Sequence, residues 1–162
     1  MAAISLSALA GAVPAHACSL SLILAIDVSS SVNADEYRLQ VGGTANALED
    51  PEVIAAISDV GGIQLMAFEW SGTYRHFEMV PWTLIEDAAD VFGVSAQLRA
   101  HERVRNDLPT SMGSALGYAS TRFAKAPLQC ARQVIDVSGD GVNNEGFGPS
   151  EAYANFPFAG VQ

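Results

Sequence analysis

Five side chains in this sequence are oxygen donors of the kind that binds a hard metal ion. Three lie in the run Asp-Val-Ser-Ser-Ser, where residues two apart in an extended turn point the same way and can converge on one cation. A threonine and a second aspartate add a hydroxyl and a carboxylate from further along the chain. This donor set suits Mg²⁺, with Mn²⁺ or Ca²⁺ as substitutes, and does not suit zinc. The predicted metal-binding residues are Asp27, Ser29, Ser31, Thr110 and Asp140.

A magnesium site of this composition leaves room for an external ligand. Mg²⁺ requires near-octahedral coordination and usually keeps several waters or a ligand from outside the protein. The side chains alone therefore leave the coordination shell incomplete, and a carboxylate from a protein or peptide partner can take the open position. The predicted function is a binding module rather than an enzyme.

Three other interpretations stay open. Each serine can serve a turn or a helix cap, Asp27 can cap the following helix, and Asp140 can be a turn residue before glycine. A carboxylate at a strand end beside a metal can also act as a nucleophile, which makes Asp27 a candidate for phosphoryl transfer. Against this, Asp27 has no second acid two positions later and no basic phosphate clamp nearby. The third interpretation is a metal-free scaffold domain of the cell envelope.

The elements around these residues predict a parallel sheet. Short apolar runs, typical of strands buried on both faces, occupy residues 20–27, 63–70 and 132–137, and a further strand at 74–82 forms a hairpin with the second. Helical patterns occupy residues 34–49, a short stretch after Pro51, 85–99 and 112–125. Strands separated by helices indicate a doubly wound, mostly parallel α/β sheet with helices on both faces and one antiparallel edge strand.

Two of the helices have distinctive sequence patterns. The first begins with Asn33 three positions before Glu36, which is the pattern of a capping box. In the 85–99 helix the apolar side is expected to contain Ile85, Ala88, Ala89, Phe92 and Ala96. The 112–125 helix is expected to be lined by Ala115, Leu116, Ala119 and Phe123.

In open α/β sheets the binding crevice lies beyond the carboxyl ends of the strands. Asp27 and Asp140 each follow a predicted strand, and Thr110 stands at the head of a helix. The polar stretch 101–109 before Thr110 is a predicted loop. The candidate metal ligands are therefore expected to meet at one edge of the sheet.

The same residues resemble the metal-ion-dependent adhesion site of von Willebrand factor A domains. The resemblance rests on Asp27-x-Ser29-x-Ser31, on Thr110 followed by Gly113 and Ala115, and on the Ser-Gly-Asp140-Gly loop, in that order along the chain. It implies that Ser29, Ser31 and Thr110 contact the metal directly or through water, and that Asp27 and Asp140 bind it or hold its waters. More narrowly, the runs ILAIDVSSSV, FEWSG, VPWT and VIDVSGDGVNNEG resemble a family of bacterial exported A-domain proteins of unassigned function (DUF1194-like).

Residues 1–17 are typical of a secretory signal peptide. They carry no charge and end in Ala15-His16-Ala17, a small-x-small cleavage pattern. The expected location is therefore periplasmic or extracellular. Residues 18–162 form the predicted A-type domain, which is expected to be incomplete at its C-terminus, with a helix near 151–158 and the start of another strand at 161–162.

Cys18 and Cys130 are the two cysteines of the chain. They stand nine and ten residues before Asp27 and Asp140, so neighbouring parallel strands would place them in nearly equal register. An intramolecular disulfide is predicted, and two free buried thiols are the alternative.

The net charge of −10 argues against nucleic acid and against anionic lipid as partners. His76 and His101 have no partner at metal-ligand spacing and are expected at exposed or edge positions. Glu69, at the end of a predicted strand, is expected beside the metal crevice or at the surface.

Overall fold

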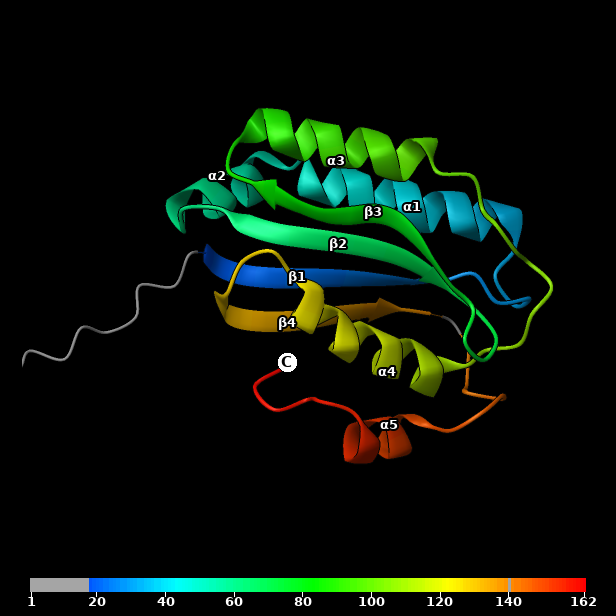
Figure 1. Ribbon diagram of the computed structural model, residues 1–162. Coiled ribbons are helices and arrows are strands. Elements are labelled where there is room, and N and C mark those ends of the chain that lie inside the picture. The colour runs from blue at the N-terminus through cyan, green and yellow to red at the C-terminus, as the bar shows by residue number, and fades with distance from the viewer. Residues whose placement is uncertain (1–17, 140) are drawn as a thin grey trace, which may run out of the picture.

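The computed structural model describes residues 18–139 and 141–162 and shows one four-stranded sheet (Figure 1). The strands are β1 (Cys18–Asp27), β2 (Ile63–Trp70), β3 (His76–Ile85) and β4 (Cys130–Ser138). Their order in the sheet is β3-β2-β1-β4, with β1 parallel to β2 and to β4, and β3 antiparallel to β2. The predicted mostly parallel sheet with one antiparallel edge strand is confirmed.

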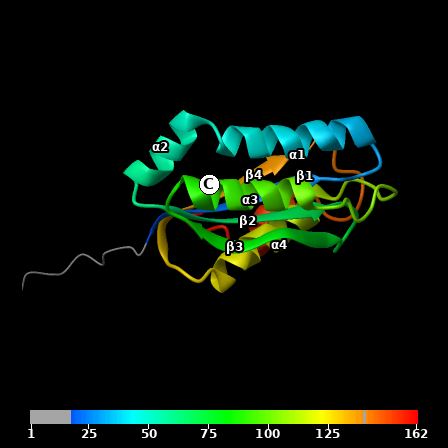
Figure 2. The same ribbon diagram turned by 90° about the horizontal axis from the view of Figure 1, so that it is seen from above.

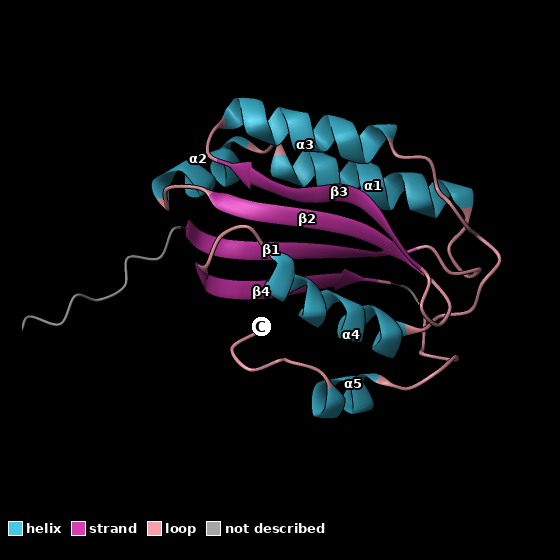
Figure 3. Ribbon diagram, in the orientation of Figure 1, coloured by secondary structure: helices cyan, strands magenta, loops and turns pink. Residues whose placement is uncertain are grey.

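Helices cover both faces of this sheet (Figure 3). One face carries α1 (Ala34–Leu48), α2 (Pro51–Asp59) and α3 (Ala88–Ala100), and the other carries α4 (Met112–Arg122) and α5 (Pro149–Asn155). The view in Figure 2 shows α1 and α4 on opposite sides of the strands. The doubly wound arrangement follows from this alternation of strands and helices.

The side chains of β1 alternate between two hydrophobic cores. Leu24 and Ile26 pack with the residues of α1, α2 and α3, whereas Ile23 and Ala25 pack against α4. Every residue of β2 is buried. The central strands are therefore apolar on both faces, which explains why they stand out in the sequence as continuous hydrophobic runs.

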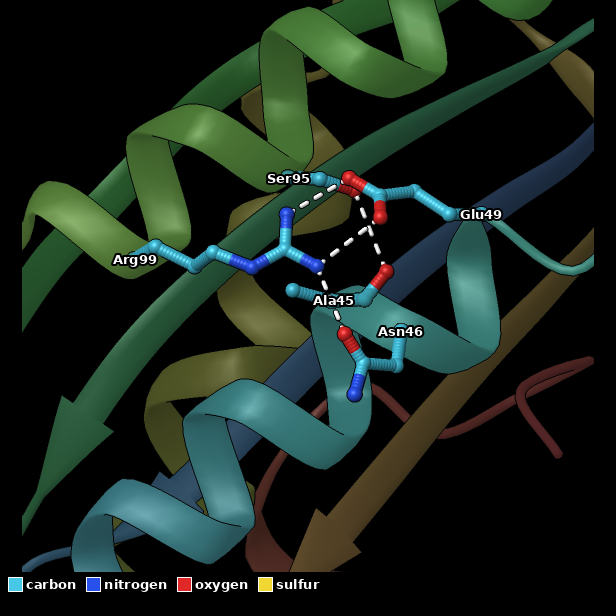
Figure 4. A network of polar contacts seen from close by, with 5 residues as sticks. All are labelled: Ala45, Asn46, Glu49, Ser95 and Arg99. Atoms are coloured by element: carbon cyan, nitrogen blue, oxygen red, sulfur yellow. Dashed lines mark hydrogen bonds and ion pairs between the residues drawn. The ribbon is translucent and has the colours of Figure 1, made fainter.

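Polar contacts fix the position of α1. Its N-terminus has the predicted capping box, in which the Asn33 side chain accepts hydrogen bonds and the Glu36 carboxylate accepts one from the Asn33 N–H. At its other end Arg99 of α3 donates to Glu49 and to Asn46, and the Ser95 hydroxyl donates to the Ala45 carbonyl (Figure 4). The hydrogen bonds from Arg99 hold the pKa of Glu49 below its usual range.

Two predicted elements are shifted along the chain. The edge strand was expected at 74–82 and the following helix at 85–99, but β3 continues to Ile85 and α3 begins only at Ala88. The boundary is set by Asp87, whose carboxylate accepts hydrogen bonds from the N–H groups of Ala89 and Asp90.

The predicted apolar side of this helix is also wrong. Phe92 is 52% exposed, and Ala89 and Ala96 are exposed as well. The buried side consists instead of Val91, Val94, Ser95 and Leu98. In contrast, all four residues expected to line the 112–125 helix are buried.

The strand β4 was expected to be buried, but every one of its residues is at least partly exposed. It lies at the edge of the sheet, where Val161 makes a parallel bridge to Gln133 and the Ile135 N–H donates to the Gln162 carbonyl. Of the strand start predicted at 161–162, the structure has a single isolated bridge at Val161. Among the described residues, no helix is both long enough and apolar enough to span a bilayer.

The predicted disulfide is present between Cys18 and Cys130. The two residues are paired in the register of β1 and β4, as their nearly equal spacing from the two aspartates predicts. The bond joins the amino ends of these strands, opposite to the edge where Asp27 ends β1.

Candidate metal-binding site

The centre of the site is the loop that follows β1. Asp27 is fully buried at the end of the strand, and its Oδ1 accepts a hydrogen bond of 2.7 Å from the Ser29 N–H. The Val32 N–H donates to the Ser29 carbonyl at 3.0 Å, which closes a tight turn. Ser29 is buried and Ser31 is exposed, so the loop runs from the interior to solvent.

The hydroxyl groups of Ser29, Ser31 and Thr110 lie close together in the loop region after Asp27. Ser29 Oγ lies 3.0 Å from Ser31 Oγ, and Thr110 Oγ1 donates to Ser29 Oγ at 3.1 Å. Neighbouring ligands in an octahedral Mg²⁺ shell of 2.0–2.1 Å radius lie about 2.9 Å apart, so these oxygen spacings fit such a shell. Four of the five predicted ligands are therefore brought to one place, and their donor chemistry fits a hard divalent cation.

Asp140, the fifth predicted ligand, lies outside the described residues. Its neighbours Gly139 and Gly141 lie against the site: a Cβ on Gly139 would be 2.9 Å from Asp27 Oδ2, and one on Gly141 would be 3.0 Å from Thr110 Oγ1. A side chain at Gly139 would therefore displace the Asp27 carboxylate, and one at Gly141 would press against the Thr110 hydroxyl. Within the described part of the chain, no three His, Cys, Asp or Glu side chains form a metal cluster.

The segment after Gly141 fixes the position of Thr110. Asn144 accepts a hydrogen bond from the Thr110 N–H through its side chain and donates its own N–H to the Thr110 carbonyl, both at 2.9 Å. Asn143 Oδ1 accepts from the Gly113 N–H at 3.2 Å, and Glu145 Oε2 accepts from the Thr73 N–H. These contacts hold the head of α4 against the β2–β3 turn.

Asn143, Asn144 and Glu145 were not among the predicted site residues. The available signal was the run Asn-Asn-Glu immediately after Asp-Gly, because amide and carboxylate side chains next to a glycine turn often hydrogen-bond to nearby main-chain groups. The sequence alone does not show that the main-chain groups belong to Thr110 and to Thr73.

Glu69 is neither a surface residue nor a metal ligand in this arrangement. It is fully buried, accepts a hydrogen bond of 2.6 Å from the Tyr37 hydroxyl, and accepts another of 3.1 Å from the Val104 N–H. Burial, and then the neighbouring Glu69 carboxylate, raise the pKa of Tyr37 above its usual value. His101 Nε2 lies 3.4 Å from Glu69 Oε2, with 17% of the His101 side chain exposed, so the expectation of an isolated histidine is wrong.

His76 lies on the edge strand β3, as expected, but packs tightly there. Its ring stacks on Tyr118 with 4.3 Å between centroids, and Ser114 Oγ lies 3.2 Å from its Nε2. Ser114 Oγ also accepts from the Tyr74 N–H, so its hydroxyl hydrogen is available to a neutral imidazole. Burial lowers the pKa of His76 to about 4.

This low pKa predicts a specific loss of stability in acid. In the unfolded chain His76 has its ordinary pKa near 6.5, so between pH 6.5 and 4 the unfolded state binds a proton that the folded state does not. The neutral imidazole causes no loss above pH 6.5; stability falls as the pH drops from 6.5 to 4 and the loss levels off below 4, at about 3 kcal/mol at most. Urea denaturation at pH 7 and pH 4 should show a smaller loss for His76→Phe than for the parent; equal losses would contradict the assignment.

Comparison with known proteins identifies the family of this chain. Residues 17–162 match the family described as "Protein of unknown function (DUF1194)". A comparison with curated protein sequences finds no significant match.

Solved structures of several A-type domain proteins share the fold. Proximal thread matrix protein 1 from the mussel byssus, described with a zinc-occupied MIDAS motif, has a TM-score of 0.66 at 17% identity over 91% of this chain and 38% of its own. BatB from Bacteroides thetaiotaomicron has a TM-score of 0.60 at 22% identity over 89% of this chain and 64% of its own.

A domain from a surface appendage is also similar. The vWF domain of the type V pili tip protein Mfa5 from Porphyromonas gingivalis has a TM-score of 0.50 at 15% identity over 78% of this chain and 39% of its own. This chain thus spans less than two thirds of each of these three structures. Together with the strand order and the matched residues, these findings show that the chain belongs to the DUF1194 family and has a von Willebrand factor A-type fold.

Proposed function

We propose that this protein is an exported, divalent-cation-dependent binding module. In this proposal Asp27, Ser29, Ser31, Thr110 and Asp140 hold Mg²⁺, and the open position of the metal accepts a carboxylate from a protein or peptide partner. The observation that supports it best is that Ser29 Oγ lies 3.0 Å from Ser31 Oγ and 3.1 Å from Thr110 Oγ1, two residues after the fully buried Asp27.

The proposed ligands differ in solvent exposure, and this difference suits a binding site. Asp27, Ser29 and Thr110 are buried, so their oxygens are held in fixed positions, whereas Ser31 is exposed at the mouth of the site. A bound cation supplies an electrophilic position that attracts a carboxylate. The protein's own contribution is to orient the hydroxyls and to leave one side of the metal accessible to solvent.

Export is supported by the disulfide and by the N-terminal sequence. Disulfides persist in oxidising compartments, and Cys18 directly follows the segment that resembles a signal peptide. Similar domains occur in a protein of the mussel byssus and in a pilus tip protein.

Metal titration tests this proposal. Isothermal titration calorimetry of Mg²⁺ and Mn²⁺ into the protein should give saturable binding, and Asp27→Asn should remove it, because a neutral amide replaces the buried carboxylate behind the hydroxyls. Zn²⁺ belongs in the same series, since the mussel protein holds zinc at its MIDAS motif. Asp35→Asn is the matched control, because Asp35 is an exposed residue of α1 paired with Arg38.

The outcomes separate the competing functions. Equal heats for the parent and Asp27→Asn, with both folded by circular dichroism, would contradict the metal site and favour the scaffold. Turnover of a generic aryl phosphate that disappears in Asp27→Asn would favour phosphoryl transfer instead. The environment of Arg103 argues against that reaction, because its guanidinium is engaged with main-chain carbonyls of the Asp27 loop rather than available as a phosphate clamp.

A further inference from the structure

The segment 101–109 contacts two loops at the edge of the sheet where the candidate site lies. It connects α3 to Thr110, and its Leu108 carbonyl accepts a hydrogen bond of 2.8 Å from the Ser30 N–H. The next carbonyl, of Pro109, accepts from the Gly72 N–H at 2.7 Å. This segment therefore lies between the loop after β1 and the turn after β2 (Figure 1).

Arg103 makes the most extensive contact of this segment with the loop after β1. Its Nη2 donates to the carbonyls of Val28, Ser29 and Val32, at 2.9, 3.1 and 2.9 Å. These carbonyls belong to the turn that presents Ser29 and Ser31. A single cationic group thus satisfies three acceptors that the turn directs to the same side.

The guanidinium of Arg103 also packs against the ring of an α1 residue. It lies over the ring of Tyr37, 5.3 Å from the centroid, and the Tyr37 hydroxyl donates to the buried Glu69. Glu69 in turn accepts from the N–H of Val104, the residue after Arg103. Contacts from α1 and β2 therefore fix both the side chain and the backbone of this part of the segment.

We infer that Arg103 is the positioning residue of residues 28–32, which we call the metal loop. It holds this loop in the turn that places Ser29 Oγ next to Ser31 Oγ and Thr110 Oγ1. Its effect on metal affinity rests on the proposed function, whereas its effect on the conformation of the loop does not.

Two measurements on Arg103→Met test this inference. The first is amide hydrogen exchange at Ser29, Ser30 and Val32, whose N–H groups are all hydrogen-bonded in the closed turn. We expect their exchange to be at least about 10-fold faster than in the parent, with the amides of β2 unchanged as an internal reference for global stability. The second is Mg²⁺ titration, in which affinity should fall by about 10- to 100-fold.

Two further variants separate positioning from general destabilisation. Arg103→Lys retains a cation with three donors and should restore most of the slow exchange and of the affinity. Arg99→Met removes another arginine that bridges two elements, from α3 to α1, without contact to the loop (Figure 4). It should leave both measurements unchanged.

The results distinguish failure of this inference from failure of the proposed function. Unchanged exchange at residues 29–32 in Arg103→Met would overturn the inference whether or not the parent binds metal. Faster exchange in a protein whose parent binds no divalent cation would retain Arg103 as the residue that holds the loop and would reject the metal site. Faster exchange with unchanged metal affinity would reject its role in metal binding.

Discussion

Replacing Cys18 and Cys130 together by alanine is expected to lower the free energy of unfolding by about 4 kcal/mol. The bond joins residues 112 apart in the sequence, and in the chain-entropy description a cross-link over a loop of roughly 100 residues stabilises a protein by about 4.7 kcal/mol. Such a loss is a large part of the total stability of a domain of this size. Urea denaturation of the parent, of the double variant and of the parent under reductant measures the effect.

Reduction of the parent and the double substitution should give the same midpoint, because both remove the same constraint. The fold near Asp27 should be retained in the absence of urea, since nine residues of extended strand, about 30 Å, separate the bond from the metal loop. A double variant as stable as the oxidised parent would show that residual structure in the unfolded chain already provides the constraint.

Gly113→Ala is expected to destabilise the protein by about 3 kcal/mol, although alanine normally favours a helix. A Cβ at this position would lie 2.1 Å from the Phe147 carbonyl oxygen and 2.8 Å from the Gly148 carbonyl oxygen. Both are main-chain atoms that cannot rotate away, so α4 or the 143–148 segment must move. Thermal and urea denaturation of the purified variant measure the loss.

A second glycine in a helix provides the control. Among the described residues, no atom beyond the neighbouring backbone of α1 lies within 4 Å of a Cβ placed on Gly42, so Gly42→Ala should stabilise the protein by about 0.5–1 kcal/mol. Gly113→Ala should also weaken metal binding, because the displaced segment carries Asn144, which holds both main-chain groups of Thr110. Stabilisation by both substitutions would contradict the close approach of the two segments.

The central part of the fold could be predicted because its signals are local. Each signal depends on a short stretch of sequence: the apolar run ending at Asp27, the capping box of Asn33 and Glu36, and the nearly equal spacing of each cysteine from its aspartate. The boundary between β3 and α3 was misplaced because Ile85 continues the helical spacing as well as the strand. Ile85 belongs to the strand because the helix is capped only at Asp87 and because Val91 and Leu98, rather than Ile85, form its side buried against the other helices.

The oxygen donors of the site were accessible to sequence reasoning, but their support was not. Asp27, Ser29 and Ser31 follow one another in a short run, and Thr110 and Asp140 stand at a predicted helix head and after a predicted strand. Arg103 and Glu69 act on partners more than thirty residues away in the sequence, and no local pattern encodes such pairs. Side chains that hold loops through such distant contacts therefore require the tertiary structure for their assignment.

The pairing of β1 on both sides also has a mechanical consequence. A load applied through the carboxyl end of β1 runs along the strand axis, where parallel partners β2 and β4 flank it over nearly its whole length. Such a load shears many hydrogen bonds at once instead of opening them one by one, so no single bond bears it. The covalent link from Cys18 to Cys130 then stops β1 from sliding past β4. In the proposed function, a ligand held at this edge of the sheet would load β1 along this axis.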